Sequence, residues 1–280
     1  MLSKKHSKEC FFKIKRGIIM KKKIVAIGGG ENGRILSNGT KKKYETGPMD
    51  KEIIRLTGKE KPNFLFIGHA QFANNQKGYF ETMKRIYEDM YDCPCKMLKS
   101  TELRDTEKVN ELIDWADIIY EGGGNTLDMI KLWKNTGFDK ILKEAWEKGK
   151  VLCGVSAGAC CWFDECLSDA LKILYGKDQP FISVKCLGFF KAFFTPHCDE
   201  DDRYESTKKQ LKENNMVGIL LSNCSAIEIV DDKYRIITSD ASKHGIEAYG
   251  LKSYYDNDKF IEKKIEESDE FRSIDELFSK

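Results

Sequence analysis

The sequence predicts an α/β fold: a mostly parallel sheet with helices on both faces and an antiparallel hairpin near the C-terminal edge. From Lys23 onward, short apolar runs alternate with longer amphipathic stretches, which is the rhythm of βα units. The short runs are hydrophobic almost throughout, as expected of strands covered on both faces. Ligands of such folds bind at the carboxyl ends of the strands, so functional residues are expected there.

Five apolar runs in the first half of the chain are predicted strands. Each is short, apolar and bounded by polar or glycine residues, as buried strands are. They are KIVAIG ending at Gly28, NFLFIG ending at Gly68, KMLK near Met97, DIIY ending at Tyr120 and KVLCGV ending at Val155.

Five stretches among these runs are predicted helices. Their apolar residues recur every three or four positions, which gives each helix one face for the sheet. They are DKEIIRLTG from Asp50, GYFETMKRIYEDMY from Gly78, DTEKVNELIDWA from Asp105, NTLDMIKLWKN from Asn125 and GFDKILKEAWEKGK from Gly137.

The pattern changes after Ser156. AIEIV and KYRIITS, separated by DDK, predict the antiparallel hairpin. From about residue 255 the chain is rich in acidic residues, and the sequence predicts an exposed helix and an acidic tail. No repeat or low-complexity linker divides the chain, so we expect one domain over 21–280, preceded by a dispensable basic extension over 1–20.

Composition excludes several classes of protein. The formal net charge is +2, and the first 23 residues hold nine Lys/Arg against one Glu, so the remainder is mildly acidic and gives no reason to expect nucleic acid as a partner. Ten cysteines without a CxxC pair indicate a reduced, cytoplasmic setting rather than a disulfide scaffold. No run of 18 apolar residues occurs, so no membrane partner is expected.

Two glycine loops follow predicted strands. GGGENG formally matches a dinucleotide fingerprint through Gly28, Gly30 and Gly33, but the polar RILSNGT that follows argues against the required helix and favours a wide loop near the site. YEGGGNT offers free backbone N–H groups around Gly123 and Gly124 and a helix cap at Asn125. The second loop is therefore a candidate oxyanion hole, with a tight capped turn as the alternative.

The segment KVLCGVSAGACC has the parts of a nucleophile elbow. A strand ends at Val155, Ser156 stands between Gly154 and Gly158, and ACCWFDECL can continue as a helix. Small neighbours are needed because the backbone folds tightly around such a serine. We therefore predict Ser156 as a nucleophile.

A serine nucleophile needs a base, and the chain has four histidines. His6 lies in the basic extension and His244 lies in SKHGIE. His197 is best placed, because it follows the strand-like KAFF and Pro196. His69 also follows a predicted strand and is a candidate substrate contact.

With EGGGNT, GVSAGACCWF and TPHCDEDDR in this order, the chain resembles the S51 serine peptidases, the family of aspartyl dipeptidase (peptidase E) and cyanophycinase, from about Lys21 to Val230. The resemblance implies a flavodoxin-like fold similar to class I glutamine amidotransferases, with serine in place of the elbow cysteine. It implies Ser156 as nucleophile and His197 as general base. It also implies an oxyanion hole at the N–H groups of Gly123 and Ala157.

The same resemblance places the triad acid between the serine and the histidine. Asp169 is the first choice and Glu165 the second, while Asp164 and Asp178 are less well spaced. Family substrates are short peptides with N-terminal aspartate or aspartate-rich polymers. Substrate contacts are accordingly expected from four residues: Gly124, Asn125, His69 and Arg203, whose guanidinium can bind a carboxylate.

Alternative functions are an esterase-like hydrolase and a non-catalytic small-molecule-binding protein of the same fold. The separation of Ser156 and His197 is short for an α/β-hydrolase esterase, and Cys153, Cys160 and Cys161 are misplaced for an elbow cysteine. No His/Cys/Asp cluster has ligand spacing, so no metal and no cofactor are expected. A homodimer is left open.

Overall fold

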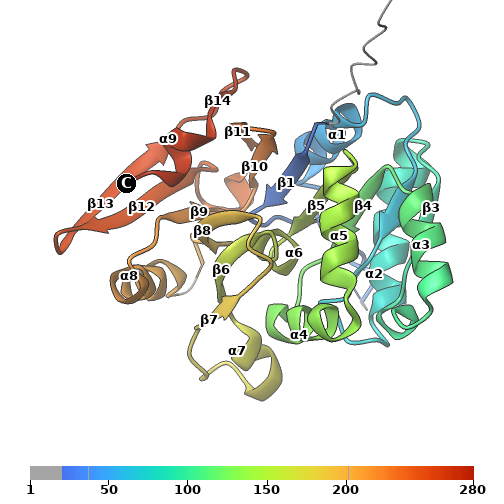
Figure 1. Cartoon of the computed structure of the whole chain (residues 1–280), viewed down its shortest axis with the longest axis horizontal. Helices are drawn as coiled ribbons and strands as arrows, with labels where there is room; N and C mark the ends of the chain where they lie inside the picture. Colours follow the sequence, from blue (N-terminus) through green and yellow to red (C-terminus); the bar gives the residue numbers. More distant parts are fainter. Residues whose placement is uncertain (1–20, 37, 201) are drawn as a thin grey trace, which may run out of the picture.

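Two β-sheets organise the chain (Figure 1), of which the computed structural model describes residues 21–36, 38–200 and 202–280. The basic extension predicted over 1–20 lies outside the described residues. The α/β class predicted from the sequence is confirmed.

The larger sheet has the strand order β14-β11-β10-β1-β5-β4-β2-β3. Its parallel part forms from the five apolar runs predicted as strands. Four of these strands are buried on both faces, and the fifth, β3, is a half-exposed strand at the sheet edge. These strands are β1 (Lys23–Ile27), β2 (Phe64–Phe66), β3 (Cys95–Met97), β4 (Ile118–Glu121) and β5 (Val151–Val155).

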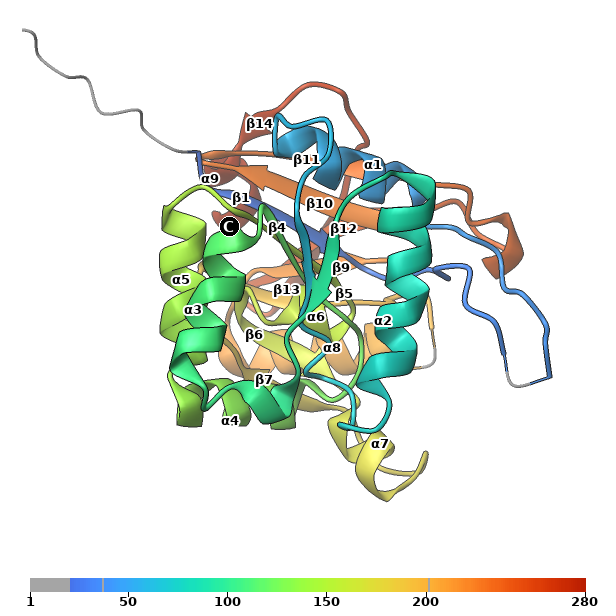
Figure 2. The same ribbon diagram turned by 90° about the vertical axis from the view of Figure 1, so that its right-hand side faces the viewer.

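Helices cover both faces of this sheet (Figure 2). On one face pack α1 (Gly47–Leu56) and α2 (Gln76–Lys84), which continues as the π-helical turn η1 (Arg85–Met90). On the other pack α3 (Thr106–Trp115), α4 (Thr126–Thr136) and α5 (Phe138–Glu147). Each places its apolar stripe on the strands, as the three- and four-residue spacing predicted.

The predicted hairpin forms the antiparallel edge of this sheet. Strand β10 (Ser225–Val230) pairs with both β1 and β11 (Lys233–Thr238). The two-residue strand β14 (Arg272–Ser273) follows at the edge.

The second sheet was not predicted from the sequence, and one segment predicted as a helix belongs to it. The order is β13-β12-β9-β8-β6-β7. The helix expected over ACCWFDECL ends after one turn as α6 (Ala157–Cys160), and β6 (Phe163–Ser168) follows it. Phe163 stacks on Phe194 at 4.5 Å between ring centroids, so these apolar residues pair with β8 (Phe190–Thr195) instead of extending a helix.

The other elements of this half of the chain include three more strands of the second sheet and α8, which packs on that sheet. They are α7 (Ala170–Tyr175), β7 (Ile182–Lys185), α8 (Arg203–Asn214), β9 (Gly218–Leu221), the 3₁₀ turn η3 (Ser242–His244) and β12 (Gly250–Asp256). A further 3₁₀ turn, η2 (Ser100–Glu102), follows β3. In the described part of the chain, none of the helices combines the length and apolar character needed to cross a bilayer.

The helix and exposed tail predicted beyond residue 255 are also corrected. The segment forms β13 (Lys259–Ile265), β14 and a short α9 (Ile274–Phe278). Strand β13 pairs along its whole length with β12 at the sheet edge, where charged side chains suit a solvent-facing strand. Leu277 is fully buried and Phe278 packs on Phe190, so the end of the chain belongs to the core.

Candidate active site

Ser156 stands at a strained turn between β5 and α6. Its backbone has φ 56° and ψ −114°, a conformation that a non-glycine residue adopts only where its surroundings enforce it. The Ser156 N–H donates to Ile27 O at 3.0 Å, and its carbonyl accepts from Ala159 and Cys160 at 2.9 Å. The turn is thus bonded to β1 on one side and to α6 on the other.

The glycines of GVSAG are required by close packing against β4. A Cβ built on Gly154 would lie 2.5 Å from Glu121 O, and one on Gly158 would lie 2.2 Å from the same oxygen. Neither distance is sterically possible without moving the backbone. The pattern read from the sequence therefore reflects a real elbow geometry.

The loop after β4 brings Gly123 beside Ser156. A Cβ on Gly123 would lie 3.3 Å from Ser156 Cβ and 3.8 Å from its Oγ. The Gly123 N–H donates to Tyr79 Oη at a long 3.4 Å. Ala157 begins α6, where backbone N–H groups have no partner within the helix. The Gly123 and Ala157 N–H groups therefore lie on either side of the Ser156 turn.

His197 reaches the same place from the second sheet. It follows β8 and Pro196, its φ is 48°, and its N–H donates to Gly28 O at 3.1 Å. Its Nδ1 lies 2.8 Å from Asn223 Oδ1 and 3.6 Å from Glu200 Oε1. Because an amide oxygen can only accept, the Nδ1 is the protonated nitrogen, which leaves Nε2 free to accept a proton.

Carboxylates in turn fix the Asn223 side chain. Its Nδ2 donates to Glu200 Oε1 at 2.6 Å and to Asp199 Oδ2 at 3.1 Å, and its backbone N–H donates to Asp199 Oδ1 at 2.7 Å. These bonds point Oδ1 at the imidazole. The nearby His197 ring, 3.6 Å away, lowers the pKa of Glu200 to about 2, so this carboxylate is ionised beside the ring.

The first glycine loop makes room for this pair. A Cβ on Gly29 would lie 2.2 Å from Asn223 Oδ1 and 2.3 Å from His197 Nδ1. Isolated bridges join Asn32, within GGGENG, to Tyr44 and Ile35 to Lys41, and the described residues between this loop and α1 form no helix. The loop is not a dinucleotide fingerprint.

A cavity of about 590 Å³ adjoins the candidate catalytic residues. Ser156, His197, Asn223, Glu200 and Gly123 all line it. No hydrogen bond joins Ser156 Oγ to His197 across the residues that the structure describes. Such bonds are often loose before substrate binds and tighten in the complex.

The carboxylates expected to complete the triad lie elsewhere. Asp169 accepts from Arg203 Nη2 at 2.7 Å, and Glu165 accepts from Ser183 Oγ at 2.7 Å. The expectation that Asp169 or Glu165 orients His197 is corrected, because Asn223 occupies that place. Arg203 is buried by its ion pair with Asp169 and by the Phe181 ring and does not line the cavity, so its expected substrate contact is also corrected.

The other expected substrate contacts are structural. His69 is buried; its Nε2 lies 2.8 Å from Leu98 O and its Nδ1 accepts from Trp133 Nε1 at 2.9 Å. Burial lowers the pKa of His69 to about 4, so the ring is neutral. Asn125 caps α4 by accepting from the Asp128 N–H, and Gly124 packs against Ala70. None of these residues lines the cavity.

Sequence reasoning missed Asn223, Glu200 and Arg34. Arg34 lines the cavity and holds Glu31 in bidentate fashion, with Nε and Nη2 at 3.0 and 3.1 Å from the two carboxylate oxygens. The acidic CDEDDR run after His197 was a usable signal for Glu200. Asn223 and Arg34 lie far from the serine in sequence and carry no local pattern.

Comparison with known proteins agrees with the family resemblance seen in the sequence. Residues 34–237 match peptidase family S51. The uncharacterized peptidase YgaJ of Bacillus subtilis (strain 168) is 30% identical over 230 residues, covering 81% of this chain and 91% of YgaJ.

Two solved structures share the fold. A peptidase from an acI-B1 Actinobacterium has a TM-score of 0.64 at 20% identity, covering 91% of this chain and 98% of its own. A putative peptidase E protein from Listeria monocytogenes EGD-e has a TM-score of 0.58 at 20% identity, covering 79% and 100%.

Proposed function

Because the chain belongs to peptidase family S51, we propose that it is a serine peptidase that hydrolyses short peptides, with Ser156 as nucleophile and His197 as general base. The observation that carries this proposal is the backbone of Ser156, which is strained at the apex of an elbow and shares a cavity with His197. Strain of this kind persists only where surrounding packing maintains it, and it concentrates at reactive residues.

The reaction follows from the roles of these groups. His197 Nε2 takes the hydroxyl proton as Ser156 Oγ attacks the peptide carbonyl carbon. The Gly123 and Ala157 N–H groups hold the oxyanion, a contact for which Gly123 exchanges its long bond to Tyr79. The imidazolium then protonates the leaving amine, and water attacks the acyl-enzyme with His197 again as base.

In this proposal two side chains replace the acid of a catalytic triad: a neutral amide orients the histidine, and a nearby carboxylate supplies the negative charge. Asn223 Oδ1 fixes the Nδ1–H tautomer of His197, and Glu200 supplies the negative charge that favours the imidazolium. Asn223 can orient the imidazole while Glu200 supplies the charge, because Asn223 Nδ2 and His197 Nδ1 both face the same Glu200 oxygen.

The cavity also supports a preference for acidic dipeptides. Its volume of about 590 Å³ is in the range of small-ligand sites. Arg34 already binds the Glu31 carboxylate through two N–H groups, so a substrate aspartate can replace Glu31 in the same geometry. Glu200 and Glu31 also line the cavity and suit a substrate amino group.

Turnover of a dipeptide library by wild type and Ser156→Ala tests the chemistry. We expect the variant to lose at least about four orders of magnitude in kcat/KM while keeping its thermal unfolding curve. Equal activity of the two proteins would contradict the proposal. A wild type that cleaves carboxylic esters but no dipeptide would favour the esterase.

The substrate preference has its own test. Arg34→Met should lower kcat/KM for Asp-X dipeptides about tenfold or more relative to Ala-X dipeptides. Lys42→Met is the matched control, because Lys42 also pairs with Glu31, at 3.5 Å, but does not line the cavity. An unchanged ratio in Arg34→Met would contradict the assignment of Arg34.

A further inference from the structure

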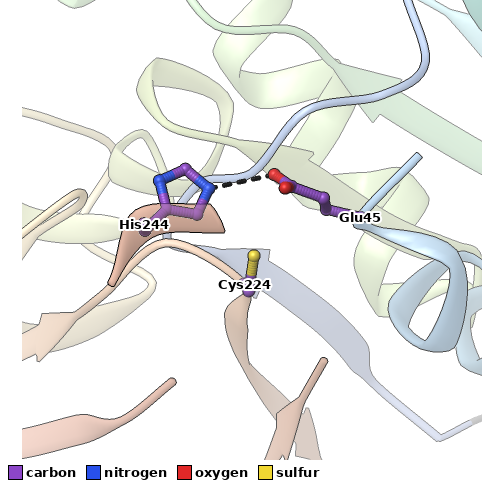
Figure 3. A group of neighbouring side chains, drawn as sticks. All are labelled: Glu45, Cys224 and His244. Atoms are coloured by element: carbon purple, nitrogen blue, oxygen red, sulfur yellow. Dashed lines mark hydrogen bonds and ion pairs between the residues drawn. The ribbon is translucent and has the colours of Figure 1, made fainter. Parts of the chain in front are cut away.

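Three side chains of types that can bind metal ions meet beside the cavity (Figure 3). They are Glu45, which precedes α1; Cys224, in the turn between β9 and β10; and His244, at the end of η3. One donor atom from each lies within 4.8 Å of the others. The thiol of Cys224 is directed toward the Glu45–His244 pair.

From this convergence we infer that Glu45, Cys224 and His244 form a binding site for Zn²⁺ or a similar divalent transition metal. Thiolate, imidazole and carboxylate are the three ligand types of protein zinc sites. Together they supply two negative charges and a neutral ring, which balance the metal charge. A neutral cluster is the form in which an ion can be buried at low cost.

The spacing of the donors fits zinc. Zinc binds sulfur at about 2.3 Å, imidazole nitrogen at about 2.0–2.1 Å and carboxylate oxygen at about 2.0–2.2 Å, so tetrahedral geometry sets nitrogen and oxygen about 3.3 Å apart and sulfur about 3.6 Å from each. His244 Nε2 and Glu45 Oε2 are 3.0 Å apart. Because the three donor atoms lie within 4.8 Å of one another, metal binding would require Cys224 Sγ to approach the other two donors and the ion pair to open slightly.

The ligands are held by neighbours, as metal ligands usually are. The Glu31 N–H donates to Glu45 Oε2 at 2.9 Å. Ser239 ties the other two segments together, because its N–H donates to Cys224 O at 2.8 Å and its hydroxyl donates to Glu45 O at 2.6 Å. Cys224 is fully buried, and the Glu45 side chain is 1% exposed.

The charge of the neighbouring lysine does not prevent a cation from binding. Lys43 is the adjacent positive side chain, and it is paired with Asp240. Binding replaces the hydrogen bond between His244 and Glu45 and releases the thiol proton of Cys224 to solvent. With three protein ligands, the fourth position of a tetrahedral zinc would be left for water.

The site has a structural consequence. Cys224 follows Asn223 directly, and His244 lines the cavity. A bound metal would therefore anchor the turn that carries Asn223 and join it to the segments of Glu45 and Ser239. Sequence spacing gave no sign of this site, because the ligands are far apart in the chain.

Co²⁺ titration of the chelator-treated, reduced full chain tests the inference. We expect one equivalent to produce a thiolate-to-cobalt charge-transfer band that Zn²⁺ then abolishes by displacement. The readout is spectroscopic, so it is independent of whether the protein is a peptidase. Absence of the band in wild type would overturn the inference.

Variants locate the metal. Cys224→Ser should lose the band. His244→Gln should weaken Zn²⁺ affinity at least about tenfold, since even changes to residues that only contact the ligands cost about 10–100-fold. His244 is partly exposed, so this second variant tests the site without a change in the core. Cys93→Ser, a remote buried thiol, is the control and should keep the band. A band that survives in Cys224→Ser, or disappears in Cys93→Ser, would overturn the assignment.

Discussion

Asn223 is the residue on which the orientation of His197 depends. Its Oδ1 lies 2.8 Å from His197 Nδ1, and its two amide protons are occupied by Asp199 and Glu200. An amide held in this way cannot rotate to present its NH₂ group to the ring. It therefore selects one imidazole tautomer without contributing charge.

Substitution of Asn223 is expected to separate orientation from stability. Asn223→Ala removes the acceptor for Nδ1, and kcat/KM should fall by about two to four orders of magnitude, the range known for loss of an orienting triad group. Asn223→Asp restores an acceptor and should recover part of the activity. Steady-state kinetics on an Asp-X dipeptide provide the measurement.

Asn125→Ala is the matched control, because Asn125 is an equally buried asparagine that caps α4 outside the cavity. It should cost about 1 kcal/mol of stability and leave kcat/KM intact. Activity retained in Asn223→Ala would show that His197 is oriented by something else.

At the residue scale, the sequence predicted that Ser156 and His197 lie at one site, but it did not predict the side chains that hold His197. Ser156 and His197 each follow an apolar strand and stand in short segments with their own steric signature. The orienting group was sought among carboxylates near the serine, yet an amide on a later turn fills that place. His69 resembled a site residue because it ends a strand, but its ring is held in the core by Trp133 and Leu98.

The loop after β1 is the element that allows the histidine to approach. Gly28 accepts the His197 N–H at 3.1 Å, and Gly29 leaves the space occupied by the imidazole and by Asn223 Oδ1. The run resembles a nucleotide-binding motif, but its glycine at position 29 is required because the His197 and Asn223 side chains pack against the backbone there.

Gly29→Ala should disrupt the site without unfolding the protein. The added Cβ would meet His197 and Asn223 at 2.2–2.4 Å, so the pair must separate, and kcat/KM should fall at least about a hundredfold. Near-ultraviolet circular dichroism would verify the fold. Gly47→Ala is the control: it lies at the start of α1, away from the cavity, and should leave kcat/KM unchanged. Wild-type kinetics in Gly29→Ala would contradict the packing argument.

Elements differed in how well the sequence predicted them. The parallel strands β1, β2, β4 and β5 are continuous apolar runs whose burial is decided locally, and the helices between them follow their own periodicity. The second sheet depends on pairing between distant segments. Strand β6 therefore resembled a helix, and the charged edge strand β13 resembled a solvated tail.

For the whole molecule, the site lies where the two sheets meet. Ser156 follows β5 of the larger sheet, and His197 follows β8 of the second. Asn223 lies in the turn that crosses from β9 to β10, and so from one sheet to the other. The relative position of the sheets therefore sets the geometry of the proposed triad.

The pH dependence of stability should show two buried groups with opposite effects. Burial lowers the pKa of His69 from 6.5 to about 4, so between these values the unfolded chain binds more protons and stability from His69 rises with pH. Burial raises the pKa of Asp50 from 3.8 to about 6, so in that range the folded chain binds more protons and stability from Asp50 falls as pH rises.

Differences between unfolding curves isolate these contributions. The stability of wild type relative to His69→Gln should rise by roughly 3 kcal/mol across the His69 range, whereas that relative to Asp50→Asn should fall by a similar amount across its own. Urea denaturation at several pH values provides both differences. Flat differences would contradict the burial argument for the group concerned.

Labelling with a fluorophosphonate reports directly whether Ser156 is activated, because the reagent reacts with a serine hydroxyl that has a neighbouring base. We expect that wild type is labelled once, that peptide mapping finds the adduct on Ser156, and that His197→Ala slows labelling at least about a hundredfold. A wild-type chain that stays unlabelled, or that carries the adduct at another residue, would contradict this expectation.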